Sequence, residues 1–272
     1  MLTKIEVTNE QGQTLVLPLY DPSEGIFVKE IEGLDPVKAI LVSSSFATVD
    51  GAQYQSSRRE TRDITMKLGM EMGYGLSIRD IRQRLYSFFM PKSNALLRFF
   101  VEGVDPVDIY GRIEVMESAL FTQEPEAFIT LRCFDPDFFD PTPTVINQST
   151  VSTTTEFPVE YDGTVETGIT LVMTTPRALS SLDIYHRAPD GTLRTLEFEA
   201  ALSTNDKLTI STVTGAKKAI RTRAGSDSSI LYGISPYSFW INLFPGTNYL
   251  RVVATGTAIP FTIEYTTKYG GL

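Results

Sequence analysis

Apolar and polar residues alternate along several short stretches in the first half of the chain, as in half-buried β-strands. Within residues 61–70, four apolar side chains fall on one face: Ile64, Met66, Leu68 and Met70. Similar patterns predict further strands over residues 3–7, 14–19, 26–31, 37–45, 95–101, 111–117 and 126–134. The first half is therefore predicted to be mainly β.

One segment of this half has the spacing of a helix. Between Ser77 and Met90, apolar residues recur every three or four positions and form one stripe: Ile78, Ile81, Leu85, Phe88 and Phe89. Ser77 is a suitable N-cap, with Asp80 three residues later as in a capping box. Pro91 lacks an amide donor and disfavours helical backbone at Met90, so the helix is predicted over residues 77–90.

Proline, serine and threonine dominate the middle of the chain. Residues 135–144 read DPDFFDPTPT and residues 147–155 read NQSTVSTTT, which is typical of a linker or an edge segment. We predict an α+β first domain over residues 1–142 and a second domain over residues 143–272.

The second half is strand-like almost throughout. Short apolar stretches predict strands over 157–161, 168–174, 182–187, 193–198, 207–212, 216–222, 238–243, 249–254 and 261–267. Asp190-Gly191 is typical of a hairpin turn. Strands spaced in this way predict an antiparallel β-sandwich of about eight strands.

Composition narrows the possible functions. The chain has 272 residues, 42% of them hydrophobic and 21% charged, as in a folded globular protein. It does not begin with a secretory signal pattern, and no apolar run is long enough to span a bilayer, so membrane insertion is not expected. One cysteine and one histidine exclude an internal disulfide and a Cys/His zinc site, and they leave few ways to build a catalytic triad.

The negative charge lies mostly in the first half. The net charge is −9, and residues 1–142 hold 14 basic and 22 acidic side chains, a balance of −8. This balance argues against specific binding of nucleic acid, which needs a basic face. Arg58, Arg59 and Arg62 lie beside Glu60 and Asp63, and such alternating signs favour cross-strand or intersubunit ion pairs over phosphate binding.

Few residues suggest a catalytic or metal site. Cys133 lies on the apolar face of its predicted strand, so it is expected to be a buried thiol. His186 ends an apolar run and is expected at a surface or turn. Asp135, Asp137 and Asp140 lack the spacing of a calcium loop and are expected to accept local backbone hydrogen bonds. No nucleotide, hydrolase or zinc-protease motif is present, so we predict no cofactor, no metal and no catalytic residue.

Trp240 and Asn242 form the one candidate binding site. In a strand over residues 238–243 both side chains point to the same face, where the indole could stack on a sugar ring and the amide could bond its hydroxyls. The alternative is that a second sheet or another subunit covers this face. Carboxylate pairs suited to glycoside hydrolysis are compatible with 33 acidic residues but are not indicated by them.

Several stretches resemble the distal tail protein family of bacteriophages with long, non-contractile tails. They are Gly33-Leu34, FATVDGA at 46–52, SSRRETRDITMKL at 56–68, the helix at 77–90, LRCFDPDFF at 131–139, LFPGTNYLRV at 243–252, and the strand Phe261–Tyr265. Each motif is structural and degenerate. Their order and spacing, followed by an all-β second domain, carry the resemblance.

This resemblance implies a structural function without catalysis. Such proteins form a homo-hexameric ring at the end of the tail tube, around a channel for DNA, and carry a galectin-like or carbohydrate-module-like sandwich outside it. They join the tail-tube protein to the tail-tip hub or tail-associated lysin, and in some phages they hold receptor-binding proteins. The expected location is the virion, after synthesis in the host cytoplasm. The alternative is a carbohydrate-binding β-sandwich adhesin that recognises a host glycan.

Overall fold

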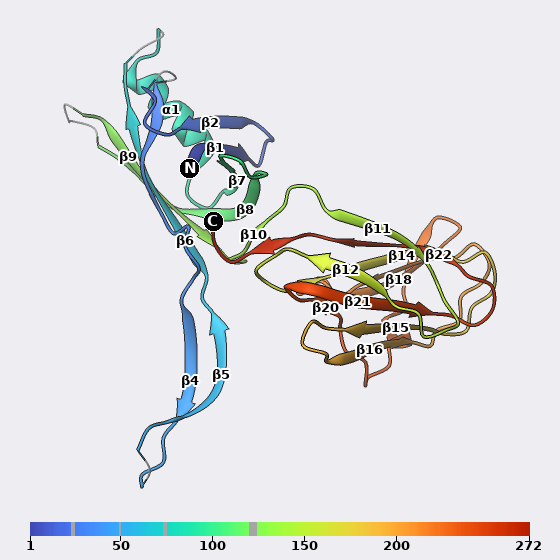
Figure 1. Cartoon of the computed structure of the whole chain (residues 1–272). Coiled ribbons are helices and arrows are strands. Elements are labelled where there is room, and N and C mark those ends of the chain that lie inside the picture. The colour runs from blue at the N-terminus through green and yellow to red at the C-terminus, as the bar shows by residue number, and fades with distance from the viewer. Residues whose placement is uncertain (23–24, 49, 73–74, 120–123) are drawn as a thin grey trace. The chain divides into compact units, whose positions relative to one another are not determined.

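The chain folds as two compact units joined at residues 141–142 and 268–269 (Figure 1). The computed structural model describes residues 1–22, 25–48, 50–72, 75–119 and 124–272, so Val49 of the FATVDGA stretch lies outside the described residues. The first domain comprises Met1–Pro141 and Tyr269–Leu272, and the second comprises Thr142–Lys268. The return of the last four residues to the first domain was not predicted. The prediction of a mainly β protein is confirmed.

Seven antiparallel strands form the main sheet of the first domain. In spatial order they are β2 (Thr14–Pro18), β1 (Leu2–Asn9), β7 (Asn94–Val101), β8 (Val107–Ser118), β9 (Glu126–Cys133), β6 (Arg62–Met70) and β3 (Ile26–Glu32). Beyond β2, Leu19 forms a bridge to Val28 of β3, and the amide of Tyr20 donates to the Val28 carbonyl at 3.1 Å. The sheet therefore curls until its two end strands meet.

A single helix, α1 (Ile78–Phe89), packs on this sheet and begins and ends where the sequence predicts. The Ser77 hydroxyl accepts from the Asp80 amide while the Asp80 carboxylate accepts from the Ser77 amide, which forms a full capping box. Ile81, Leu85, Phe88 and Phe89 are buried in the core with the inward residues of the strands. The predicted apolar stripe is confirmed.

The Pro/Thr-rich middle of the chain is structured rather than a free linker. Phe138–Phe139 (β10) pairs with β8 and with β23 (Lys268–Tyr269). Thr144–Ser149 (β11) is the edge strand of a sheet in the second domain. The linker interpretation was wrong and the edge interpretation was right for residues 144–149.

Two facing sheets make up most of the second domain. The larger has the order β11, β22 (Pro260–Tyr265), β14 (Thr170–Thr174), β17 (Lys207–Ser211), β18 (Lys218–Arg223) and β19 (Ser226–Ser229). The smaller has the order β12 (Phe157–Tyr161), β21 (Gly246–Val253), β15 (Leu182–Arg187) and β16 (Leu193–Phe198). Inward residues of both sheets share one core, as predicted for a sandwich.

The predicted strand at 238–243 is mostly wrong. Only Asn242–Leu243 (β20) pairs there, with the short β13 (Thr167–Gly168), after the 3-10 turn η2 (Leu231–Gly233). Phe239 is 60% exposed while Ile241 is fully buried, so these residues do not share a face as strand alternation requires. Within the ranges described above, no helix is long and apolar enough to cross a membrane.

Candidate assembly surface

Among the described elements of the first domain, the most exposed is a two-stranded arm, residues 39–48 and 50–59. It consists of β4 (Ala39–Ser44) and β5 (Gln53–Arg59), which pair with each other and extend away from the main sheet (Figure 1). Leu41 and Tyr54 are 67% and 61% exposed, and Phe46 near the tip is also exposed. An isolated hairpin is marginally stable in water, and exposed apolar groups on it indicate a contact surface.

An ion pair fixes the base of the arm. The Arg59 guanidinium donates to both carboxylate oxygens of Asp137, through Nη1 to Oδ1 and through Nη2 to Oδ2 at 2.9 Å. Asp137 is buried while the Arg59 side chain is 41% exposed, so this bidentate contact lies at the edge of the domain surface. The arm is therefore anchored to the segment that leaves β9.

Arg62 holds three separate backbone segments together through four carbonyl oxygens. Its guanidinium donates to the carbonyls of Pro136 (2.7 Å), Gly33 (2.5 Å), Asp35 (2.7 Å) and Gly270 (2.6 Å). The side chain is 1% exposed and burial lowers the pKa of its guanidinium. Arg62 therefore joins the loop after β3, the exit from β9 and the C-terminal segment.

The neighbouring charges form ion pairs, as the alternating signs predicted. Asp63 lies opposite Arg132 in the β6–β9 register and accepts from its Nε at 2.9 Å. Arg132 also contacts Glu114 at 3.2 Å. The prediction of ion pairs is therefore confirmed for Asp63 and, through Asp137, for Arg59, but it is wrong for Arg62, which donates to backbone carbonyls instead.

The three aspartates of the DPDFFD segment are used within the domain. Asp135 accepts from the Asp137 amide at 3.3 Å, and Asp140 is 3.4 Å from the Tyr269 hydroxyl. Among the residues that the structure describes, no group of three acidic, histidine or cysteine side chains is placed to hold a metal ion. The expected local backbone hydrogen bond is confirmed for Asp135.

Cys133 is a buried thiol, as predicted. It is fully buried, and desolvation raises its pKa to about 12. A thiol in this state is a poor nucleophile.

His186 is buried, so the prediction of a surface or turn position is wrong. The Asn248 amide nitrogen donates to the carbonyls of Phe244 (2.7 Å) and Gly246 (3.0 Å), which turns Asn248 Oδ1 toward the imidazole. His186 Nε2 lies 3.0 Å from that oxygen and therefore carries the proton, while the buried Nδ1 has no hydrogen-bond partner. Burial lowers the pKa of His186 below 6.5, although the hydrogen bond that Nε2 donates to Asn248 Oδ1 acts in the opposite direction.

This environment predicts that acid destabilises the second domain. Below pH 6.5 the unfolded chain binds a proton at His186 that the folded domain resists, so the free energy of unfolding falls as pH falls from 7.5 to 5. The slope from this group is at most about 1.4 kcal/mol per pH unit. Urea unfolding can be followed by the fluorescence of the single tryptophan, which lies in this domain.

His186→Gln is the matched variant for this measurement, because glutamine keeps an amide donor but does not titrate. We expect its free energy of unfolding to depend less on pH across the same range. Equal pH dependence of the two proteins would show that another group is responsible.

Trp240 and Asn242 lie close together in sequence but not on a free strand face. Trp240 is partly buried against the core of the second domain, and the Lys217 ammonium lies 5.4 Å from the centre of its ring. Asn242 is also half-buried, in β20. Sugar binding by these two residues stays a prediction.

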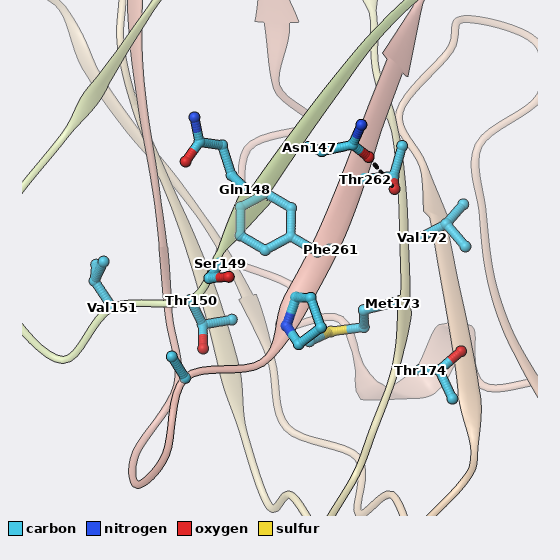
Figure 2. Close-up of a pocket in the computed structure, with 12 residues that line it drawn as sticks. Asn147, Gln148, Ser149, Thr150, Val151, Val172, Met173, Thr174, Phe261 and Thr262 are labelled. Carbon is cyan, nitrogen blue, oxygen red and sulfur yellow. Dashed lines mark hydrogen bonds between the residues drawn. The ribbon is translucent and has the colours of Figure 1, made fainter.

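Figure 2 shows an open groove along one end of β11, β14 and β22 that the sequence did not indicate. It has a volume of about 890 Å³ and is lined by amides, hydroxyls and apolar groups, with Asn147 Oδ1 accepting from the Thr262 hydroxyl at 3.0 Å. None of the lining side chains titrates near neutral pH. The groove can form hydrogen bonds but offers no acid, base or nucleophile.

The fold and the exposed apolar residues of the arm indicate a protein with a surface for contact with other protein chains. A curled antiparallel sheet with an exposed arm is followed by a β-sandwich, and Cys133 and His186 are both buried. A search of curated sequences found no significant match.

Two further comparisons identify the family domain and the fold. Residues 162–269 match the family model of the siphovirus-type tail component, C-terminal domain. The crystal structure of the Dit (gp 19.1) protein of phage SPP1, described as a paradigm of the hub adsorption apparatus in phages infecting Gram-positive bacteria, superposes with a TM-score of 0.68. The identity is 18%, and the match covers 97% of this chain and 98% of that one.

The baseplate of phage p2 contains a chain of similar fold. Its activated conformation with Sr matches with a TM-score of 0.52 and 9% identity over 99% of both chains, and the form with Ca gives 0.52 and 10% over 100% of both. The resemblance to siphophage distal tail proteins that the sequence predicted is therefore confirmed, by the family model in the second domain and by the fold over the whole chain.

Proposed function

We propose that this chain is a structural component of a phage tail tip. In this proposal six copies form a ring that joins the tail tube to the baseplate hub or tail-associated lysin, or to receptor-binding proteins, in the virion. The observation that carries the proposal is the match of nearly the whole chain to the SPP1 Dit fold, together with the tail-component domain at 162–269.

The arm supports self-association. In a closed ring each subunit presents two different surfaces to its neighbours, and the contact is completed by rotation. A hairpin with exposed Leu41 and Tyr54 gains most by burial against such a neighbour. Association also covers strand edges that otherwise invite aggregation.

The charge supports a channel that does not retain DNA. Six copies at −9 each carry −54, and the first domain contributes most of it. An acidic lumen repels phosphates, so the genome can slide without binding. A ring structure with its acidic residues on the outer wall and its basic residues along the channel would contradict this part of the proposal.

The same proposal makes the protein a non-enzyme. The only thiol and the only imidazole are buried, and the large groove of the second domain has no titratable lining. A ring-forming adaptor has no reaction barrier to lower, and no activated nucleophile is indicated among the residues described.

Mass photometry of the purified full-length chain tests the ring. We expect a species of about 181 kDa, six times the chain mass of 30.2 kDa.

Leu41→Ser with Tyr54→Ser is expected to shift the population to smaller species, because both side chains lose apolar contact area while the folded domain loses little. A chain that stays monomeric at tens of micromolar, as measured by light scattering, would contradict the proposal.

A further inference from the structure

Two adjoining hollows beside β8 and β9 form a basic cleft in the acidic first domain. One, of about 490 Å³, is lined by Lys92, Arg112, Glu114, Arg132, Phe134 and neighbouring residues. The other, of about 440 Å³, shares Arg132 and adds Arg58, Arg59, Glu60 and Asp63. Five cationic and three anionic side chains therefore line this basic cleft, although residues 1–142 have a balance of −8.

The positive charges of the basic cleft are only partly neutralised within the chain. Arg112 lies directly opposite Arg132 in the β8–β9 register, and like charges in this position repel. Arg132 is compensated by Asp63 and Glu114. Among the described residues no carboxylate lies within ion-pair distance of Arg112, which donates only to the Lys92 carbonyl at 2.9 Å.

Apolar groups lie next to these charges. Phe134 is 68% exposed at one side of the basic cleft, with Pro91 beside it, and Ile40 lies at the other side. A concave surface that combines arginine with an exposed aromatic ring has the composition of a protein interface rather than of ordinary surface.

The same hairpin that carries Arg112 ends in a surface of opposite charge. Residues 102–105, Glu-Gly-Val-Asp, form the turn between β7 and β8, and all four are exposed. Val104 is 67% exposed, and Asp105 forms no ion pair among the described residues. Glu102 has one long contact of 3.9 Å, with the exposed N-terminal ammonium. This acidic turn has an apolar residue between two carboxylates.

The acidic turn cannot reach the basic cleft of its own chain. Asn94 lies opposite Arg112 at the start of β7, and the turn begins after Val101 at the other end of that strand. At about 3.3 Å per residue, the two lie roughly 23 Å apart along the hairpin. Opposite charge at the two ends of one hairpin fits head-to-tail contact between copies.

We propose that the acidic turn of one copy of this chain docks into the basic cleft of the next copy, with Asp105 facing Arg112 and Val104 contacting Phe134. The inference rests on the proposed ring and specifies one of its contacts. Because turn and cleft are different surfaces, the contact is heterologous and can close into a ring. Its charges are partly exposed, so salt weakens it.

Charge reversal with the full-length chain tests this contact. We expect Arg112→Glu and Asp105→Arg each to weaken association at least tenfold, as measured by mass photometry across a concentration series. The double variant that carries both changes is expected to assemble again. An equimolar mixture of the two single variants is also expected to assemble, because rings of alternating subunits match opposite charges at every contact.

Arg79→Glu is the control, since it makes the same change of charge on the exposed face of α1, outside the basic cleft. Far-UV circular dichroism of each variant checks that the fold is kept. If both single variants assemble as the wild type does, this contact is overturned but the proposed ring is not. Loss of assembly that neither the double variant nor the mixture restores overturns the Asp105–Arg112 pairing. A monomeric wild type overturns the ring and this contact together.

Discussion

Replacing Arg62 with methionine is expected to destabilise the first domain by roughly 4 kcal/mol, which corresponds to a fall of roughly 10 °C in its Tm. Methionine fills much of the volume but donates no hydrogen bond, so four carbonyl acceptors lose their shared partner. An unsatisfied buried acceptor costs about 1–3 kcal/mol before relaxation. Differential scanning calorimetry of the full chain measures the loss as a shift of one transition.

The same variant is expected to release the C-terminal segment. Gly270 is held by Arg62, and the Leu272 amide donates to the Leu34 carbonyl at 3.1 Å. Carboxypeptidase should therefore remove the last residues of Arg62→Met faster than those of the wild type. Arg62→Lys is expected to give an intermediate loss, since an ammonium cannot reproduce the planar fork.

Arg58→Met is the matched control for Arg62→Met. Arg58 lies on the exposed β5, so its replacement is expected to change the free energy of unfolding by no more than about 0.5 kcal/mol. Equal losses in the two variants would show that the four carbonyl contacts of Arg62 do not hold the domain together.

Elements with a buried face could be predicted from the sequence. The helix at 78–89 combines a capping residue, an apolar stripe and a following proline, and the strand at 62–70 alternates strictly. The strand at 53–59 is exposed at every position, so it has no apolar face to alternate. The edge strand at 144–149 is also exposed at most positions, so its polar residues give no alternating pattern.

For the interior polar residues, the sequence could predict burial but not the hydrogen-bond partners. Arg62 has the same parity as Ile64 and Met66, and His186 has the same parity as Leu182 and Ile184, so strict alternation would have placed both inside. Their partners could not be predicted, because Gly270 and Asn248 come from distant segments that only the folded topology brings close.

The surfaces proposed for assembly could not be predicted from the sequence, because they depend on strand register and on contacts with other copies. Arg112 and Arg132 are 20 positions apart, and only the β8–β9 pairing places them opposite each other. The exposed Phe134 and Val104 are single apolar residues, which carry no periodic signal. Periodic sequence patterns reflect which side chains are buried within one chain, so they do not predict contacts with a second copy.

Leu85→Asp is expected to unfold the first domain and abolish assembly. Leu85 is fully buried at the centre of the α1 stripe, between Ile81 and the pair Phe88–Phe89. An unpaired carboxylate at this position costs several kcal/mol, and the lost leucine contacts add roughly 2–5 kcal/mol. Because whole domains hold only about 5–15 kcal/mol, little of the folded first domain should remain.

Tryptophan fluorescence separates this effect from general misfolding. The single tryptophan lies in the second domain, so its unfolding transition should persist in Leu85→Asp while the calorimetric transition of the first domain disappears. Gln83→Asp adds the same carboxylate on the exposed side of α1 and should keep both transitions. If Leu85→Asp still forms particles of wild-type mass, the α1 stripe is dispensable for the fold on which the proposed ring depends.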